Sequence, residues 1–133
     1  MTARTALLLV TSLIASFLCS AQPCFAAEEV GGVIVRIAEL EIAPAHLDAY
    51  KLALQEEIET SIRVEPGVLT LYAVSLKGHP EQIRLFEMYK DAASYAAHLQ
   101  SPHFKAYKTQ TQSMVKALRL IETEPILLRS KAR

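Results

Sequence analysis

Two ionisable side chains have the chemistry to move a proton. His98 suits the role of a base or a proton shuttle, because histidine is the residue type whose free side chain changes charge near neutral pH. Glu87 alternates with Ile83, Leu85 and Tyr89, and a carboxylate on such an apolar strand face must find a partner or take up a proton. Two structural alternatives remain open. His98 could bond a carbonyl at a helix end, and Glu87 could pair with Arg36, Arg63 or Arg84.

Large apolar side chains near these two groups are candidates to bind an aromatic ligand. They are Tyr72, Phe86, Met88, Tyr89 and Phe104. Residues of this kind at strand or helix spacing also build hydrophobic cores, so pocket lining and packing are both open.

The histidines and cysteines of the sequence give little support for a metal site or for thiol chemistry. His98 and His103 are five residues apart, and none of the four histidines has the spacing of a recognised zinc or iron motif. Both cysteines, Cys19 and Cys24, lie near the N-terminus in a segment that we expect to be removed. We therefore predict no metal ligands, no disulfide and no cysteine nucleophile.

That N-terminal segment has the features of a cleavable export signal. Arg4 provides a positive charge, the run from Ala6 to Leu18 is mostly apolar, and small residues precede cleavage after Ala26 or Ala27. The apolar run is shorter than the roughly 20 residues of a membrane-spanning helix, although an uncleaved anchor is the alternative. We predict a signal peptide at 1–27 and an exported protein, periplasmic or secreted, without a stable membrane anchor after cleavage.

Length and charge limit the remaining possibilities. A chain of 133 residues leaves room for one domain, over 28–133. Lys plus Arg and Asp plus Glu number 14 each, so no overall field attracts phosphate backbones, and we expect no nucleic-acid partner.

Two periodicities divide this domain. Alternating and β-branched apolar residues predict strands over 33–42, 68–75, 82–89 and 119–128. Apolar spacings of three and four predict helices over 45–64, 92–99 and 103–117. A polar loop over 76–81 joins the second and third strands, and Pro125 predicts an edge position or a bulge for the last strand.

This order of elements matches a ferredoxin-like split βαβ fold, an α+β architecture in which an antiparallel four-stranded sheet carries helices on one side. Val35 and Ile37 on the first strand, and Phe86 and Met88 on the third, also place apolar groups on the other face. The same face of a second copy is the simplest cover, so we expect a homodimer.

Three segments resemble the antibiotic biosynthesis monooxygenase family, and within it the quinol monooxygenase branch. They are Glu65-Pro66-Gly67-Val68-Leu69, Phe86-Glu87-Met88-Tyr89-Lys90-Asp91 and Ala97-His98-Leu99-Gln100-Ser101-Pro102-His103-Phe104. The spacing between the segments also fits, and the resemblance runs from about Val33 to Ile126.

The resemblance implies a dimeric α/β barrel, in which two ferredoxin-like subunits join sheet to sheet and each holds a pocket between sheet and helices. Enzymes of this family oxidise quinol-like or anthrone-like aromatics with molecular oxygen and without metal, flavin or haem. His98 occupies the position of the family's recurrent histidine. Other members isomerise or degrade small signalling molecules, so membership defines the fold better than the reaction. Haem-degrading relatives use Asn, Trp and His together, and this chain lacks Asn and Trp.

Oxygenation without a cofactor needs a base, a group that steadies the resulting anion, and a dry apolar wall. We therefore predict a cofactor-independent, monooxygenase-like enzyme that acts on a small quinol-type or related aromatic molecule and on molecular oxygen. In this hypothesis His98 is the base and Glu87 is the orienting group. The alternative is a non-catalytic small-molecule-binding or stress-related dimer of the same fold.

Overall fold

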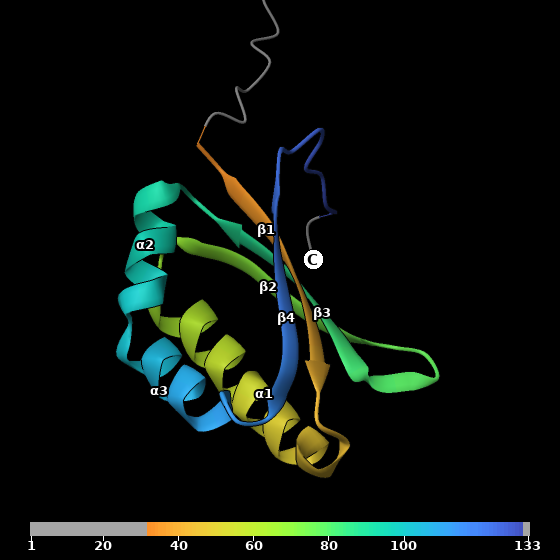
Figure 1. The fold of residues 1–133 in the computed structure, drawn as a ribbon. Helices are drawn as coiled ribbons and strands as arrows, with labels where there is room; N and C mark the ends of the chain where they lie inside the picture. Colours follow the sequence, from red (N-terminus) through yellow and green to blue (C-terminus); the bar gives the residue numbers. More distant parts are fainter. Residues whose placement is uncertain (1–31, 132–133) are drawn as a thin grey trace, which may run out of the picture.

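The computed structural model describes residues 32–131, which form four strands and three α-helices (Figure 1). In chain order they are β1 (Ile34–Ile42), a short 3-10 helix η1 (Pro44–His46), α1 (Leu47–Val64), β2 (Val68–Leu76), β3 (His79–Tyr89), α2 (Ala92–Gln100), α3 (Pro102–Thr111) and β4 (Val115–Thr123). The predicted signal peptide at 1–27 lies outside the described residues. Within residues 32–131, no helix is long and apolar enough to span a membrane.

The four strands form one antiparallel sheet in the order β2-β3-β1-β4, with α1, α2 and α3 on one face (Figure 1). β1 is central, pairing with β3 from Ile34↔Tyr89 to Glu41↔Gln82 and with β4 on its other side. This is the ferredoxin-like arrangement, so the predicted α+β fold is confirmed. β4 is an edge strand, although it ends at Thr123 and Pro125 lies beyond it rather than within it as predicted.

The hydrophobic core lies between the sheet and α1. Alternate residues of β1, namely Ala38, Leu40 and Ile42, point toward the helices and pack with Tyr50 and Leu54 of α1. Tyr50 and Ile42 are fully buried. Burying side chains of this size stabilises a fold by about 1.5–3 kcal/mol each, so this layer holds α1 against the sheet.

The opposite face of the sheet is uncovered within residues 32–131 and carries apolar side chains beside the ion pairs of Glu39 with Arg84 and Arg119. Ile37 lies between Phe86 on β3 and Ile121 on β4, and all three point away from the helices. On β2, Tyr72 and Val74 are 63% and 59% exposed. The predicted second apolar face is therefore present.

The end of the chain differs from the prediction. α3 ends at Thr111 and β4 runs over Val115–Thr123, so the predicted helix and strand are present but their bounds, 117 for the helix end and 119–128 for the strand, were wrong. Met114 and Leu118 continue the helical spacing, but the chain instead pairs with β1 from Val115 onward. β4 stops near the start of β1, where Val35 pairs with Thr123 and few further partners exist.

The hairpin loop is also shorter than predicted. β2 and β3 extend to Leu76 and His79, which pair with each other, so only Lys77 and Gly78 form the turn. Gly78 has φ +82°, a left-handed conformation that glycine adopts without steric cost. Pro80 is tolerated in β3 because the pairing with β1 begins only at Gln82.

Candidate functional site

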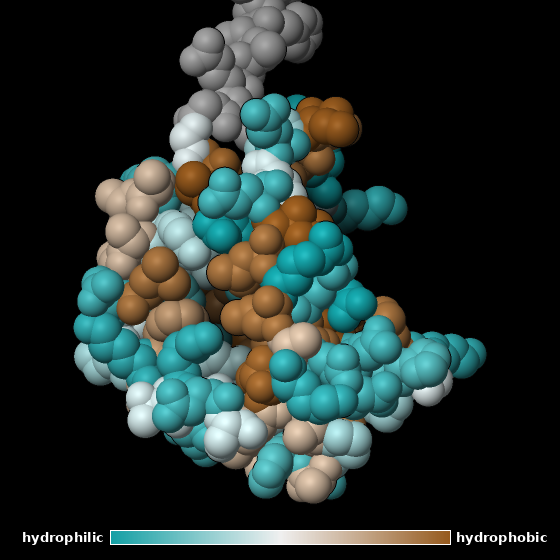
Figure 2. All heavy atoms as spheres, in the orientation of Figure 1, coloured by the Kyte–Doolittle hydropathy of each residue, from teal (hydrophilic) through white to brown (hydrophobic). Residues whose placement is uncertain are grey.

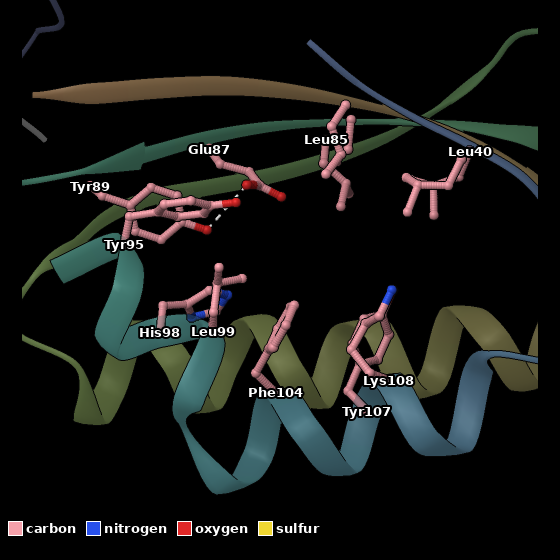
Figure 3. A pocket seen from close by; sticks show the side chains of 13 residues that line it. Leu40, Leu85, Glu87, Tyr89, Tyr95, His98, Leu99, Phe104, Tyr107 and Lys108 are labelled. Carbon is pink, nitrogen blue, oxygen red and sulfur yellow. Dashed lines mark hydrogen bonds between the residues drawn. The ribbon is translucent and has the colours of Figure 1, made fainter. Parts of the chain in front are cut away.

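A pocket of about 90 Å³ opens between the helix-facing side of the sheet and the pair α2 and α3 (Figure 3). Its walls are mainly apolar and include Leu40, Leu85, Leu99, Phe104, Leu118 and Leu120. Figure 2 shows hydrophobic side chains gathered over β4 beside a hollow, where Leu118 and Leu120 are 43% and 51% exposed. The site is thus an apolar slot that opens to solvent beside the edge strand β4.

Glu87 is the carboxylate that points into this slot from β3 (Figure 3). The Tyr89 hydroxyl donates a hydrogen bond of 3.1 Å to its Oε2. Burial raises the pKa of Glu87 above its ordinary value, although the Tyr89 hydrogen bond and the nearby His98 oppose this shift. Arg36 lies directly across the β1–β3 register, and its Cζ sits 4.7 Å from the centre of the Tyr95 ring. The carboxylate is therefore held, partly desolvated, at the wall of the pocket.

His98 lies beneath the slot in the last turn of α2, with only 3% of its side chain exposed. Its Nδ1 is 2.9 Å from Oε1 of Glu65, and because a carboxylate only accepts, Nδ1 carries the hydrogen. Its Nε2 is 3.7 Å from Oε1 of Glu57. Its ring packs against Tyr89 and Phe104, with centroid distances of 5.3 Å and 4.6 Å. Both nitrogens thus face carboxylates.

Glu65, at the C-terminal end of α1, joins the three helices. Its Oε1 also accepts a hydrogen bond of 2.6 Å from Nε2 of His103, at the start of α3. Burial alone would raise the pKa of Glu65, but the hydrogen bonds from His98 and His103 hold it below its ordinary value. Glu65 is therefore the ionised centre of a network that fixes both imidazoles.

Glu57 is a second buried carboxylate on α1, one turn from Ser61, whose hydroxyl donates to its Oε1 at 2.8 Å. Burial raises the pKa of Glu57, against the lowering effects of Ser61 and His98. A small cavity of about 30 Å³ is lined by Glu57, Glu87 and His98. This cavity lies between Glu87 in the slot and the hydrogen-bond network of Glu65, His98 and His103.

Three of these residues have donor atoms that could meet at a metal ion. Glu57, His98 and His103 each place a ligand atom within 4.8 Å of the others. A tetrahedral zinc site, with bonds of about 2.0–2.1 Å, needs donors roughly 3.3 Å apart, so these residues would have to move closer. His98 and His103 are also hydrogen-bonded to Glu65. As arranged, the cluster is a proton-bearing network.

The residues selected from the sequence fall into two groups. Glu87, Tyr89, His98 and Phe104 come together around the slot, although they belong to three different elements. Phe86 and Met88 alternate with Glu87 on β3 and so lie on the opposite face of the sheet. Tyr72, paired with Phe86, lies at the outer strand β2. Phe86 and Met88 thus belong to the open face, whereas Tyr72 is mostly exposed and also borders the small cavity of Glu57, Glu87 and His98.

Several contributors to the site were not among the residues selected from the sequence. Four of those with polar or charged groups are Glu57, Glu65, Tyr95 and Lys108. Glu57 carried a readable signal, because it shares the buried stripe of α1 with Tyr50, Leu54 and Ser61 at spacings of three and four. A carboxylate on such a stripe needs a partner. Tyr95 and Lys108 had no such signal.

Comparison with known proteins agrees with this architecture. The sequence profile of the family described as antibiotic biosynthesis monooxygenase matches residues 33–110. A crystal structure of a candidate antibiotic biosynthesis monooxygenase from Bacteroides thetaiotaomicron is 43% identical, with a TM-score of 0.73, over 77% of this chain and 97% of that protein.

More distant structures share the fold. A candidate antibiotic biosynthesis monooxygenase from Nitrosomonas europaea is 23% identical, with a TM-score of 0.67, over 72% of this chain and 92% of its own. One from Caulobacter crescentus is 18% identical, with a TM-score of 0.68 and the same coverage. No protein with a curated description matches this chain significantly.

Proposed function

The chain belongs to the antibiotic biosynthesis monooxygenase family, and we propose that it is a cofactor-independent monooxygenase that oxidises a small quinol-type aromatic molecule. One observation carries the proposal. Glu87, a carboxylate whose pKa is raised by burial, projects into an apolar slot directly above an imidazole that is bound to ionised Glu65. A general base is most effective when its pKa lies near the pH at which the enzyme operates, so a raised pKa suits a glutamate for this role.

The dimensions of the slot favour a single aromatic ring. Its volume of about 90 Å³ is below the roughly 150 Å³ of a closed cavity that admits benzene, but this slot is open at β4. A ring can therefore enter edge first, between Leu85 and Phe104, and leave its outer edge near Leu118 and Leu120. Fused three-ring substrates would need far more space.

The chemistry requires no electron source other than the substrate. Glu87 takes the proton of a phenolic hydroxyl, and the electron-rich phenolate transfers an electron to molecular oxygen. Recombination forms a carbon–oxygen bond, and cleavage of the oxygen–oxygen bond leaves one oxygen atom on the ring while the other leaves as water. The diphenol is oxidised to a hydroxyquinone and O₂ is fully reduced, so atoms and electrons balance. Apolar walls keep competing water away from the anion.

The sequence suggested His98 as the base and Glu87 as the orienting group, and these contacts favour the reverse assignment. In this proposal Glu87 meets the substrate, and His98 stabilises the ionised carboxylate from below. Its Nδ1 is committed to Glu65, and its Nε2 borders the small cavity that Glu87 also lines. A positive or polarised imidazole there favours the charged form of Glu87.

Oxygen uptake with a panel of single-ring hydroquinones tests the proposal. We expect uptake with formation of a hydroxyquinone by the unsubstituted protein, and a large loss in Glu87→Gln and His98→Gln. Met88→Leu is the matched control, because Met88 neighbours Glu87 on β3 but lies on the other face. Equal rates in all four proteins, or no uptake with any member of the panel, would refute the assignment.

A second candidate function is a binding protein without catalysis. The observation in its favour is that both nitrogens of His98 face carboxylates, which suits a purely structural histidine. Such a protein would be stabilised against heat by a ligand that it returns unchanged. Mass spectrometry of the ligand after incubation in air separates this function from oxidation.

Two further parts of the proposal concern assembly and location. Two copies are proposed to join through the uncovered sheet face, which gives a dimeric α/β barrel and removes exposed apolar groups such as Tyr72 and Val74 from water. Export is proposed from the composition of residues 1–27. N-terminal sequencing of protein recovered outside the cytoplasm would reveal a start at residue 27 or 28 if the segment is removed.

A further inference from the structure

The pocket has a second charged group, at the end away from Glu87. Lys108 of α3 lines the slot, and its ammonium group rises from the helix toward the sheet near Leu40, while Glu87, Tyr89 and Tyr95 occupy the other end (Figure 3). The slot is therefore polar at both ends and apolar between them.

Lys108 differs from the cations of β4 in having no ion-pair partner within the described part of the chain. Lys116 pairs with Glu41, and Arg119 pairs with Glu39. Among the ion pairs of residues 32–131, none involves Lys108. An ammonium group beside an apolar slot, paired with no carboxylate of the residues that the structure describes, can attract an anion.

From this geometry we infer that the slot selects an aromatic ring that carries an anionic substituent meta to its reactive hydroxyl, on the part of the ring that lies away from Glu87. The inference rests on the proposed function for the position of that hydroxyl at Glu87. In the strand register Glu87 pairs with Arg36, and Leu40 pairs with Ile83, so the two ends are four residues apart on β3. At about 3.3 Å per residue this is roughly 13 Å. Because the side chains of Glu87 and Lys108 fill part of that length, one ring with one short acidic group spans the rest.

The charges also set the orientation of the ring. An acidic substituent at the Glu87 end would meet a buried carboxylate and be repelled, whereas at the mouth it meets Lys108. A carboxylate, a sulfonate or a phosphate would share this recognition, because each presents anionic oxygens to the ammonium group. A neutral diphenol would enter without a preferred direction.

A binding measurement without oxygen tests the inference independently of turnover. Calorimetry under nitrogen compares gentisate, a para-diphenol with one carboxylate, with its uncharged methyl ester. Lys108 is exposed, so the gain is of the size of a solvent-screened ion pair, and we expect gentisate to bind roughly threefold to fivefold more tightly than the ester. Benzenesulfonate and phenyl phosphate analogues show which anionic group is preferred.

Two variants assign the effect to one lysine. Lys108→Met is expected to bring the affinity ratio of gentisate to ester close to one, and Lys108→Glu to reverse it. Lys105→Met is the matched control, because Lys105 is an exposed lysine of the same helix that does not line the slot. In the unsubstituted protein the ratio should also fall as salt rises from about 0.01 M to about 1 M.

The outcomes separate this inference from the proposed function. Oxygen uptake from hydroquinone with equal affinity for gentisate and ester would overturn the inference alone. A salt-sensitive preference that disappears in Lys108→Met, without any oxygen uptake, would support the inference and refute the oxidation. Failure of both ligands to bind, or equal ratios in Lys108→Met and Lys105→Met, would also overturn the inference.

Discussion

Glu65 and His98 are 33 residues apart in the sequence, and in the structure Oε1 of Glu65 lies 2.9 Å from Nδ1 of His98. The same oxygen accepts a second hydrogen bond from His103. One carboxylate therefore fixes the tautomer and the orientation of two imidazoles, and it ties the end of α1 to α2 and α3. Any role of His98 in chemistry depends on this contact.

Glu65→Gln should destabilise the protein, because an amide cannot replace an anion that accepts two imidazole hydrogen bonds. We expect the free energy of unfolding in urea to fall by about 2 kcal/mol at neutral pH. Since the folded pKa of Glu65 lies below its ordinary value, its stabilising effect is present above about pH 4.5 and is lost as the pH falls through the folded value. The difference in unfolding free energy between the two proteins should therefore shrink in acid.

Glu59→Gln, on the exposed side of α1, is the control and should change the unfolding free energy little. A difference that does not vary with pH would contradict the ionised network.

Glu87→Gln should separate catalysis from stability. As the base of the proposed reaction, Glu87 must be ionised, so activity should rise with pH through a pKa above that of an ordinary glutamate, and the variant should lose about 10²–10⁴-fold in kcat. The contribution of Glu87 to stability changes with pH in the opposite direction. A carboxyl group with a raised folded pKa stabilises the fold fully below its unfolded pKa, and loses that effect as the pH rises through the folded value.

The uncharged variant should thus become more stable relative to the unsubstituted protein as the pH rises above about 4.5. Thermal unfolding over a pH series, beside a pH–rate profile, measures both effects. Retained activity in Glu87→Gln, or a pH–rate profile with an unshifted carboxylate pKa, would count against Glu87 as the base.

Gly67→Ala should destabilise the protein, because there is no room for a side chain at this position. A Cβ atom at this position would overlap Oγ and Cβ of Ser94 and approach its Cα to 3.3 Å, because the start of β2 runs close against α2. We expect a loss of about 1–3 kcal/mol in urea unfolding. Ser94→Gly removes the overlapping atoms, so the double variant should be more stable than the sum of the single effects predicts. Additive effects would indicate that Gly67 is needed for another reason.

Most of the fold could be predicted from the sequence because the signals were local. Alternation identified three strands, and the stripe of α1 and the caps at Asp91 and Ser101 identified the helices. The end of α3 could not be predicted, because Thr111, Met114 and Leu118 fit both a helix and a helix followed by a strand. The ladder between β1 and β4 decided between them, and that pairing is a tertiary contact.

The site could be predicted only in part, for the same reason. Alternation on β3 correctly implied that Glu87 shares a buried face with Leu85 and Tyr89. That Arg36 lies opposite Glu87 depends on strand register, which the sequence did not reveal. Lys108 appeared as one more exposed residue of an amphipathic helix, and only the packing of α3 against the sheet brings it to the slot.

The uncovered sheet face gives the last prediction. Val74 of β2 is 59% exposed on a face that also carries Ile37, Phe86 and Ile121, and the proposed dimer would bury it against a second copy. Arg84 lies opposite Val74 and is already paired with Glu39, so a carboxylate introduced at position 74 would be buried without a cation of its own. Such burial is costly, and Val74→Glu should raise the dissociation constant of the dimer at least tenfold, which corresponds to about 1.4 kcal/mol. Sedimentation over a range of concentrations measures this change.

Leu52→Glu provides the comparison, because Leu52 is 69% exposed on α1, on the helix side of the sheet. This variant adds the same charge and should keep the mass of the unsubstituted protein. If Val74→Glu and Leu52→Glu dissociate alike, the effect is one of charge rather than of this face. If the unsubstituted protein is already a monomer, the sheet face is not the interface.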